Sequence, residues 1–185
     1  MSRLNSLAER DYRFATPDDV PALVSLIERS ALALQRNDYT VEQIRGALGT
    51  VFGVDTQLIN DRTYFSVYED ARLIACGGWS KRQTLFGADA AKSEADPLLN
   101  PDTDPARIRA FFVHPDFARQ GIGNQLIALC EDAARAEGFT RMALVATLSG
   151  ERLYAAKGYV PERRYVLSLD NGETMPVVSM GRTLA

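Results

Sequence analysis

The sequence predicts an α/β domain (α+β in some schemes) with a mixed, mostly antiparallel central sheet and helices on both faces. Two pairs of strand patterns are joined by short turns at 69–71 and 170–172, a spacing that favours antiparallel hairpins. Between them, a strand pattern at 107–113 leads through a glycine-rich turn into an amphipathic helix and then a strand pattern at 141–146. With 185 residues, the chain fits a single domain, 1–185, that can bury a core without disulfides or a metal.

The first expected elements are a short strand and a capped helix. Residues 12–14 alternate as a strand does. Thr16 is placed to cap a helix that has Pro17 in its first turn, where the missing N–H of proline does no harm. The apolar spacing of this helix fades after Arg29, so we expect the helix to end there.

A second helix and a hairpin follow. Thr40 and Gln43 form a capping-box pattern, and the helical apolar period after them continues to Val51. Strand patterns at 63–68 and 72–79 are separated by only three residues, which predicts that they pair antiparallel.

The second half of the chain alternates between strands and helices after one long loop. Every pattern breaks between residues 81 and 105, and we expect a long mobile loop there. The remaining expected elements are a strand at 107–113, a helix at 122–137, a strand at 141–146, a short helix at 149–157, and a last hairpin of strands 165–169 and 175–180.

Composition and charge exclude several classes of function. No apolar stretch approaches the roughly 20 residues that span a bilayer, and the first residues lack a secretory pattern, so we expect a cytoplasmic protein without a membrane partner. The net charge of −3, without a Lys/Arg cluster, argues against nucleic-acid binding. Cys76 and Cys130 lie in apolar patterns without neighbours at metal-ligand spacing, so we expect buried thiols and no metal.

The most informative segment, 111–124, combines a strand end, a turn and a helix start. Backbone N–H groups at a helix N-terminus have no intrahelical partner, and this geometry binds phosphates. Gly121 and Gly123 would let a pyrophosphate approach those donors closely, and Arg119 adds a fixed positive charge. The segment therefore predicts a site for a nucleotide-derived cofactor.

Three other interpretations of these glycines are weaker. A Rossmann fingerprint needs a third glycine where this chain has Leu126, and a Walker loop needs a Gly-Lys-Ser/Thr sequence that is absent. A glycine turn without any ligand is the remaining alternative. The proline after the strand and the tyrosine motif further along the chain both argue against it.

Residues 118–123 resemble the acyl-coenzyme A signature of the GNAT superfamily of N-acetyltransferases, Gln/Arg-x-x-Gly-x-Gly/Ala. The order of elements fits that family from about residue 12 to residue 180. Ala118 stands where the signature has Gln or Arg, and its two neighbours are placed to compensate. The resemblance implies a GNAT-like fold and acetyl-coenzyme A as co-substrate, with these binding residues: Phe112, Val113, Arg119, Gln120, Gly121, Ile122, Gly123 and Asn124.

The resemblance also implies the chemistry of transfer. The fourth and fifth strands would splay apart, and backbone groups near Phe112 and Val113 would pair with pantetheine and polarise the thioester carbonyl. Tyr154 lies in a Tyr-x-x-x-Gly-Tyr element similar to one in the family, whose tyrosine protonates the departing thiolate. A phenol with a pKa of about 10 suits that role. The alternative is that Tyr154 only packs beneath the sheet.

No general base is evident from the sequence. The family's glutamate near the start of the fourth strand corresponds to residues 106–109, which read Ala-Arg-Ile-Arg. A water chain, Glu69 or Glu151 could serve instead, and an amine that arrives neutral needs no base. His114, before a proline, is expected to stabilise the turn or to be exposed rather than to act in catalysis.

Several aromatic residues could line an acceptor pocket, although packing in the core is the preferred interpretation. They are Trp79, Tyr39, Tyr64 and Phe65. Gly77 and Gly78, inside a strand pattern, predict a bulge or a close approach of another chain segment.

The expected function is N-acetyl transfer from acetyl-coenzyme A to a primary amine, directly within a ternary complex. The acceptor is a small-molecule or peptide amine, and a homodimer is compatible with the sequence. Two alternatives stay open: a catalytically silent domain that senses acyl-coenzyme A, and a dinucleotide-dependent oxidoreductase.

Overall fold

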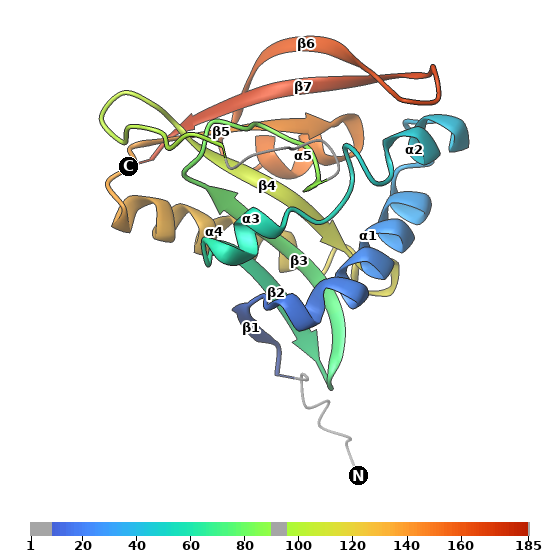
Figure 1. Cartoon of the computed structure of the whole chain (residues 1–185), viewed down its shortest axis with the longest axis horizontal. Helices are drawn as coiled ribbons and strands as arrows, with labels where there is room; N and C mark the ends of the chain where they lie inside the picture. Colours follow the sequence, from blue (N-terminus) through green and yellow to red (C-terminus); the bar gives the residue numbers. More distant parts are fainter. Residues whose placement is uncertain (1–8, 90–95, 185) are drawn as a thin grey trace.

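The computed structural model describes residues 9–89 and 96–184 of the chain (Figure 1). A seven-stranded sheet has the strand order β1-β2-β3-β4-β5-β7-β6, and every neighbouring pair is antiparallel except β4 and β5. The strands are β1 Asp11–Phe14, β2 Tyr64–Glu69, β3 Arg72–Ser80, β4 Ala106–Val113, β5 Arg141–Thr147, β6 Val160–Ser168 and β7 Thr174–Thr183. The helices are α1 Val20–Leu34, α2 Val41–Ala47, α3 Thr56–Asn60, α4 Ile122–Ala136 and α5 Leu148–Ala155.

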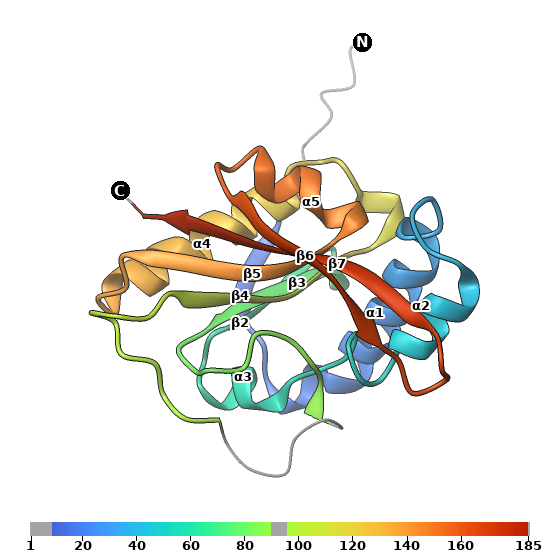
Figure 2. The same ribbon diagram turned by 90° about the horizontal axis from the view of Figure 1, so that it is seen from above.

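Helices cover both faces of the sheet, as the sequence predicts. Figure 2 shows α4 and α5 on one face and α1, α2 and α3 on the other. Each face has its own buried cluster: Leu126 and Ile127 of α4 pack in one, and Leu23 and Ile27 of α1 in the other. The mixed, mostly antiparallel sheet between two helical layers is confirmed.

The N-terminal helices begin where their caps predict. Thr40 and Gln43 form the expected capping box, with the Gln43 N–H donating to Thr40 Oγ1 at 3.1 Å. A 3₁₀ turn, Pro17–Asp19, precedes α1 and is capped by Thr16. Two expected ends are wrong, because α1 continues beyond Arg29 to Leu34 and α2 ends at Ala47.

Tertiary burial explains these differences. Ser30 and Ala31 are both buried, so the last turns of α1 are held by packing that the apolar period alone does not reveal. After α2 the chain turns at Gly49, which has a φ of +85°. The short helix α3 was not expected, and Asp55 caps it by accepting the Gln57 N–H at 3.1 Å.

The last hairpin is longer than the sequence predicts. The expected strands covered 165–169 and 175–180, whereas β6 and β7 extend over 160–168 and 174–183. Most of β6 is exposed because it is the edge strand of the sheet, so its residues need no apolar alternation.

The parallel strands β4 and β5 separate soon after they meet. They pair only at Ala106↔Met142 and Arg107↔Ala143, although β5 pairs with β7 along its whole length. Beyond these two pairs, the facing backbone edges of β4 and β5 form no ladder with each other. The splay implied by the family resemblance is therefore present.

A bulge lies beside the splay. The β3–β4 register shifts between Cys76 and Gly78, and Ala110 in β4 has a φ of +54°. A Cβ on Gly77 would lie 2.5 Å from Cδ1 of Phe111, so the absence of a side chain lets the Phe111 ring lie against the strand. This confirms the bulge and close approach expected at the glycine pair.

The described residues of the long loop, 81–89 and 96–105, contain no strand and no α-helix, as expected. They are nevertheless held to the domain. Arg82 forms two hydrogen bonds with Asp61, at 2.6 and 2.9 Å. Arg109 of β4 donates to Asp55 at 2.7 Å and to the carbonyls of Thr84 and Gly87 at 2.9 and 2.8 Å. The mobility of the loop stays a prediction.

The Arg109–Asp55 ion pair is buried, with side-chain exposures of 2% and 1%. Arg109→Met removes the guanidinium that pairs with the buried Asp55 carboxylate, so we expect the free energy of unfolding to fall by about 3–5 kcal/mol. Urea denaturation followed through the single tryptophan, Trp79, measures the change. In the control Arg164→Met, the Arg164–Glu151 pair is lost at the surface, where the effect is expected to be far smaller. Equal losses in both variants would contradict the structural role of the buried pair.

Candidate active site

The splay between β4 and β5 opens two adjoining hollows. We call the first the central cavity, which has a volume of about 160 Å³, and the second the loop groove, which has a volume of about 420 Å³. Only the groove reaches residues 117–119, 121 and 122, before and at the start of α4. The residues that line both hollows are Gln35, Phe111, Phe112, Val113, Gly123, Thr147, Gly150 and Leu153.

The turn before α4 presents a run of free backbone donors. In the part of the chain that the structure describes, no acceptor receives the N–H groups of residues 119–124, and the first bonded amide is that of Gln125, which donates to the Gly121 carbonyl at 3.1 Å. Six consecutive free amides at the positive end of a 15-residue helix form a strong anion site. The residues present therefore fit a pyrophosphate.

Two glycines shape this turn for different reasons. Gly121 is the N-cap of α4 with a φ of +83°, in the left-handed region that disfavours residues with a side chain. Gly123 lies against α5, where an added Cβ would be 3.0 Å from Cδ2 of Leu153. The first glycine is needed for the path of the backbone and the second for the approach of α5.

The other residues predicted for coenzyme binding take different positions. Arg119 is exposed and, with Asn124, lines the loop groove. Ile122 is buried in the core, so only its backbone faces the groove. Gln120 does not line the groove, and its side chain instead bonds to the Asp116 carbonyl at 3.2 Å and to Arg10.

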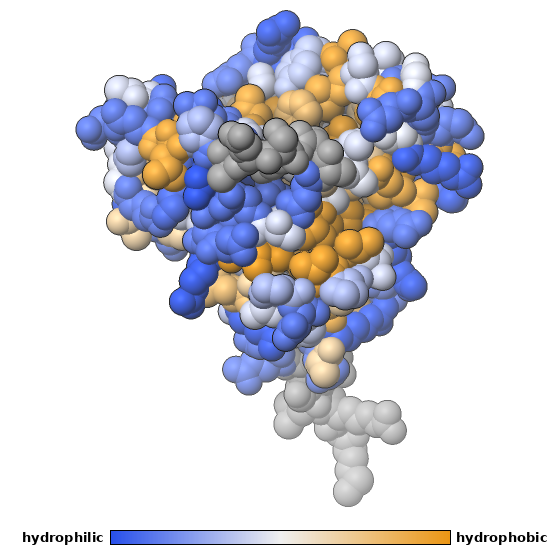
Figure 3. Space-filling model, in the orientation of Figure 1, coloured by the Kyte–Doolittle hydropathy of each residue, from blue (hydrophilic) through white to orange (hydrophobic). Residues whose placement is uncertain are grey.

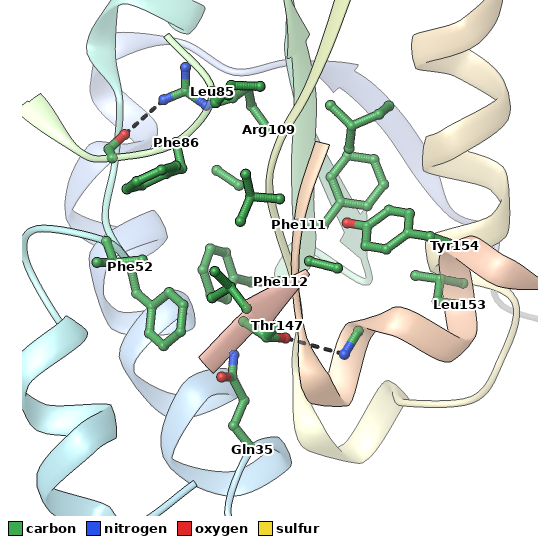
Figure 4. Close-up of a pocket in the computed structure, with 18 of the residues that line it drawn as sticks. Gln35, Phe52, Leu85, Phe86, Arg109, Phe111, Phe112, Thr147, Leu153 and Tyr154 are labelled. Atoms are coloured by element: carbon green, nitrogen blue, oxygen red, sulfur yellow. Dashed lines mark hydrogen bonds between the residues drawn. The ribbon is translucent and has the colours of Figure 1, made fainter. Parts of the chain in front are cut away.

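Tyr154 of α5 lies in the wall of the central cavity. Its ring centroid is 6.2 Å from that of Phe111, and Figure 4 shows its hydroxyl turned toward Phe111. Burial raises the pKa of Tyr154 well above its usual value, with Cys130 adding to the shift. Among the described residues its hydroxyl has no hydrogen-bond partner. The phenol is therefore protonated at neutral pH and is free to donate.

His114 stabilises the turn after β4, as expected. Its Nδ1 accepts the Asp116 N–H at 3.2 Å, and its Nε2 lies 2.8 Å from the Arg72 guanidinium. Burial and the charge of Arg72 lower the pKa of His114. Neither hollow includes this residue in its lining.

The two carboxylates suggested as a base are engaged elsewhere. Glu69 pairs with Arg10 at 3.1 Å, and Glu151 pairs with Arg164 at 2.5 Å. Neither lines the central cavity, and no other described carboxylate does.

The aromatic residues proposed for an acceptor pocket belong to the core. Trp79, Tyr64 and Phe65 lie outside the lining of the central cavity. Tyr39 is also buried, with its hydroxyl donating to the Pro176 carbonyl at 2.6 Å. The cavity is lined instead by apolar residues that the sequence did not single out: Val51, Phe52, Leu85, Phe86, Val145, Leu167 and Val177.

No local sequence signal identifies most of this lining. Phe52 follows α2 in a segment without a clear period, and Leu85 and Phe86 lie in the long loop. Figure 3 shows apolar side chains exposed on this face between α1 and α3. A surface hollow there is lined by Val24 and by Phe52, which also lines the central cavity, so Phe52 separates the cavity from this surface. In the sequence, the arginines at positions 107 and 109 place charges inside a strand pattern, which is a signal of a specialised environment there.

The described residues contain no candidate membrane span and no candidate metal site. None of their helices is long and apolar enough to cross a membrane. No group of three or more His, Cys, Asp or Glu side chains within 9–89 and 96–184 could hold a metal ion.

Solved structures share this architecture. A GCN5-related N-acetyltransferase from Rhodopseudomonas palustris superposes with a TM-score of 0.70 at 19% identity, covering 96% of this chain and 97% of that one. The PaiA N-acetyltransferase from Thermoplasma acidophilum, solved with coenzyme A, gives 0.62 at 13% identity, covering 95% and 99%. The ribosomal-protein-S18-alanine N-acetyltransferase from Escherichia coli gives 0.59 at 13% identity, covering 96% and 95%. At such identities these likenesses show the fold alone.

Sequence comparison shows the family. No curated protein matches the chain. The model of the acetyltransferase (GNAT) family, however, matches residues 29–159, which include the splayed strands, the free amides before α4 and Tyr154. The chain therefore belongs to the acetyltransferase (GNAT) family and is an acetyl-coenzyme A-dependent acetyltransferase.

Proposed function

We propose that this enzyme transfers acetyl directly to a primary amine while donor and acceptor are bound together in a ternary complex. The observation that carries the proposal is the common wall of the two hollows, at Phe112 and Val113. A donor in the loop groove and an acceptor in the central cavity would meet at this wall. Each would enter from its own side of the splay.

The nucleophiles of the chain favour direct transfer over an acyl-enzyme. Cys76 and Cys130 are fully buried, and neither lines the central cavity. Burial raises the pKa of Cys76 to about 12, which leaves almost no reactive thiolate. The Thr147 hydroxyl accepts the Gly150 N–H at 3.2 Å and serves as a helix cap. The cysteines and Thr147 are therefore not placed to carry the acetyl group, which favours the amine itself as the attacking group.

The chain's own groups account for binding of the donor. The free amides of residues 119–124 and the charge of Arg119 bind the pyrophosphate. The unpaired inner edge of β4, at Phe112 and Val113, orients the pantetheine arm. When bound, acetyl-coenzyme A supplies an activated acetyl group at the common wall.

Tyr154 supplies the proton for the leaving group. The new C–N bond forms as the C–S bond breaks, the amine gives up a proton to solvent, and the sulfur takes the proton of the Tyr154 hydroxyl. The phenol then regains a proton from solvent. Its burial beside Phe111 keeps the hydroxyl protonated until the sulfur departs.

Tyr154→Phe tests this role. We expect kcat to fall by about 10²-fold with little change in the KM for acetyl-coenzyme A, because the lost proton donor acts only in the transition state. Because burial raises the pKa of Tyr154, the wild-type rate should show no loss from tyrosine ionisation below about pH 10. The measurement is release of free thiol with a panel of primary amines between pH 6 and pH 10.

The matched control is Tyr165→Phe, because Tyr165 lies on β6 outside both hollows. It should leave kcat unchanged. If Tyr154→Phe keeps the wild-type kcat, Tyr154 is a packing residue. If calorimetry shows that acetyl-coenzyme A binds while no amine releases thiol, the protein is a sensor rather than an enzyme of this kind.

Gly121→Ala tests the position of the coenzyme. An alanine at a φ of +83° is strained, so we expect a loss of about 1 kcal/mol in stability and at least fivefold weaker binding of acetyl-coenzyme A. Gly172→Ala is the control, since Gly172 has a φ of +85° and open space around it in the β6–β7 turn. Both variants should lose similar stability, measured by urea denaturation, but only the first should bind the coenzyme less tightly in calorimetry. Equal affinities would place the pyrophosphate elsewhere.

A further inference from the structure

Gln35 brings an unpartnered polar atom to the junction of the two hollows. It is the residue directly after α1, it lines both the central cavity and the loop groove, and only 9% of it is exposed. Its Oε1 is buried and accepts no hydrogen bond from any described residue. Figure 4 shows the side chain rising toward Phe112 and Thr147, with its amide nitrogen uppermost and its oxygen turned to the side of Phe52. A buried acceptor in this position is suited to a ligand donor.

The backbone of Gln35 is hydrogen-bonded through both its N–H and its carbonyl, so the turn after α1 is held in place without help from the side-chain amide. The Gln35 carbonyl accepts the N–H groups of Asp38 at 3.1 Å and Tyr39 at 3.0 Å. The Tyr39 hydroxyl donates to the Pro176 carbonyl at 2.6 Å and accepts the Leu148 N–H at 2.8 Å. The turn after α1 is thereby tied to β7 and to the start of α5.

Beyond the residues shared with the loop groove, the described side chains that line the central cavity are apolar except for Arg109 and Tyr154. Aromatic rings from Phe52 and Phe86 and aliphatic side chains from the loop, β5, β6 and β7 enclose it. For comparison, a sealed apolar cavity of about 150 Å³ holds a molecule of the size of benzene. The central cavity, at about 160 Å³, is of that order.

Charge in the cavity argues against two classes of acceptor. No described carboxylate lines it, so a second cationic centre, as in a polyamine, would have no partner. The one charged residue in its described lining, Arg109, is bonded to Asp55 and to the Thr84 and Gly87 carbonyls. The carboxylate of a free amino acid would have to compete with those bonds.

We infer that the acceptor is a primary amine on a small apolar or aromatic body, and that Gln35 Oε1 accepts a hydrogen bond from its amino group. The inference rests on the proposed direct transfer and names the substrate class of the same site. The apolar body occupies the region of Phe52, Phe86 and Leu167. The amine lies at the junction, beside Gln35 and the common wall. Gln35 is a binding and positioning residue that selects amines.

Gln35→Met tests the inference because methionine keeps the length of the side chain and removes the amide. With saturating acetyl-coenzyme A, we expect the KM for 2-phenylethylamine to rise about tenfold, because the variant loses one hydrogen bond from the amino group of the acceptor. The Kd for acetyl-coenzyme A should stay within twofold of the wild type in calorimetry. The melting temperature should not fall, since the variant removes a buried atom that has no partner.

Two further variants and two probes complete the test. Gln35→Glu retains an acceptor oxygen and should keep the KM for 2-phenylethylamine within threefold. Gln83→Ala, at an exposed glutamine outside both hollows, should change nothing. The wild type should have a kcat/KM for 2-phenylethylamine at least tenfold above that for putrescine or glycine.

The outcomes separate this inference from the proposed function. Faster turnover of putrescine or glycine, or an unchanged amine KM in Gln35→Met, would overturn the inference while direct transfer stands. A lower melting temperature with unchanged KM would make Gln35 a structural residue. Binding of acetyl-coenzyme A without thiol release from any amine would overturn the proposed function itself, and the inference with it.

Discussion

The site depends on the separation of two parallel strands after two residue pairs. β4 and β5 meet at Ala106↔Met142 and Arg107↔Ala143 and then diverge. Beyond these pairs, the facing backbone edges of the two strands form no hydrogen bonds to each other. Unpaired backbone groups in an interior are costly, so a sheet keeps such a gap only where something else occupies it. Here the gap opens into the loop groove and the central cavity, and the end of β4 at Phe112 and Val113 lines both.

The strain of the splay is contained by its neighbours. On one side, β5 is paired with β7 along its length, so it cannot close the gap without breaking that ladder. On the other, β4 is bulged at Ala110 and fitted against Gly77, and the buried Arg109 ties it to Asp55 and the long loop. The ion pair thus connects the shape of β4 to the loop that brings Phe86 to the cavity.

Local signals in the sequence point to the proposed coenzyme side of the site, but not to the proposed acceptor side. The free amides, Gly121 and the start of α4 are contiguous, so one segment contains the whole arrangement. The acceptor side is assembled from α1, the segment after α2, the long loop and three strands, and no motif spans them. The splay was implied only by family resemblance. Gln35 could not be found, because the hollows that it lines are completed by residues such as Phe112 and Thr147, which lie far from it in the sequence.

The chemistry of Gln35 shows how this assembly can select a substrate. A buried acceptor without a partner costs about 1–3 kcal/mol in the folded protein. The Gln35 oxygen does not stabilise the fold in exchange, because the Gln35 carbonyl and the Tyr39 hydroxyl already hold the turn after α1. That free energy is recovered when a ligand N–H reaches the junction. An apolar molecule that fills the cavity but lacks a donor leaves the atom unsatisfied. The apolar lining therefore favours a small apolar molecule, and the Gln35 oxygen disfavours one that has no amine placed to donate to it.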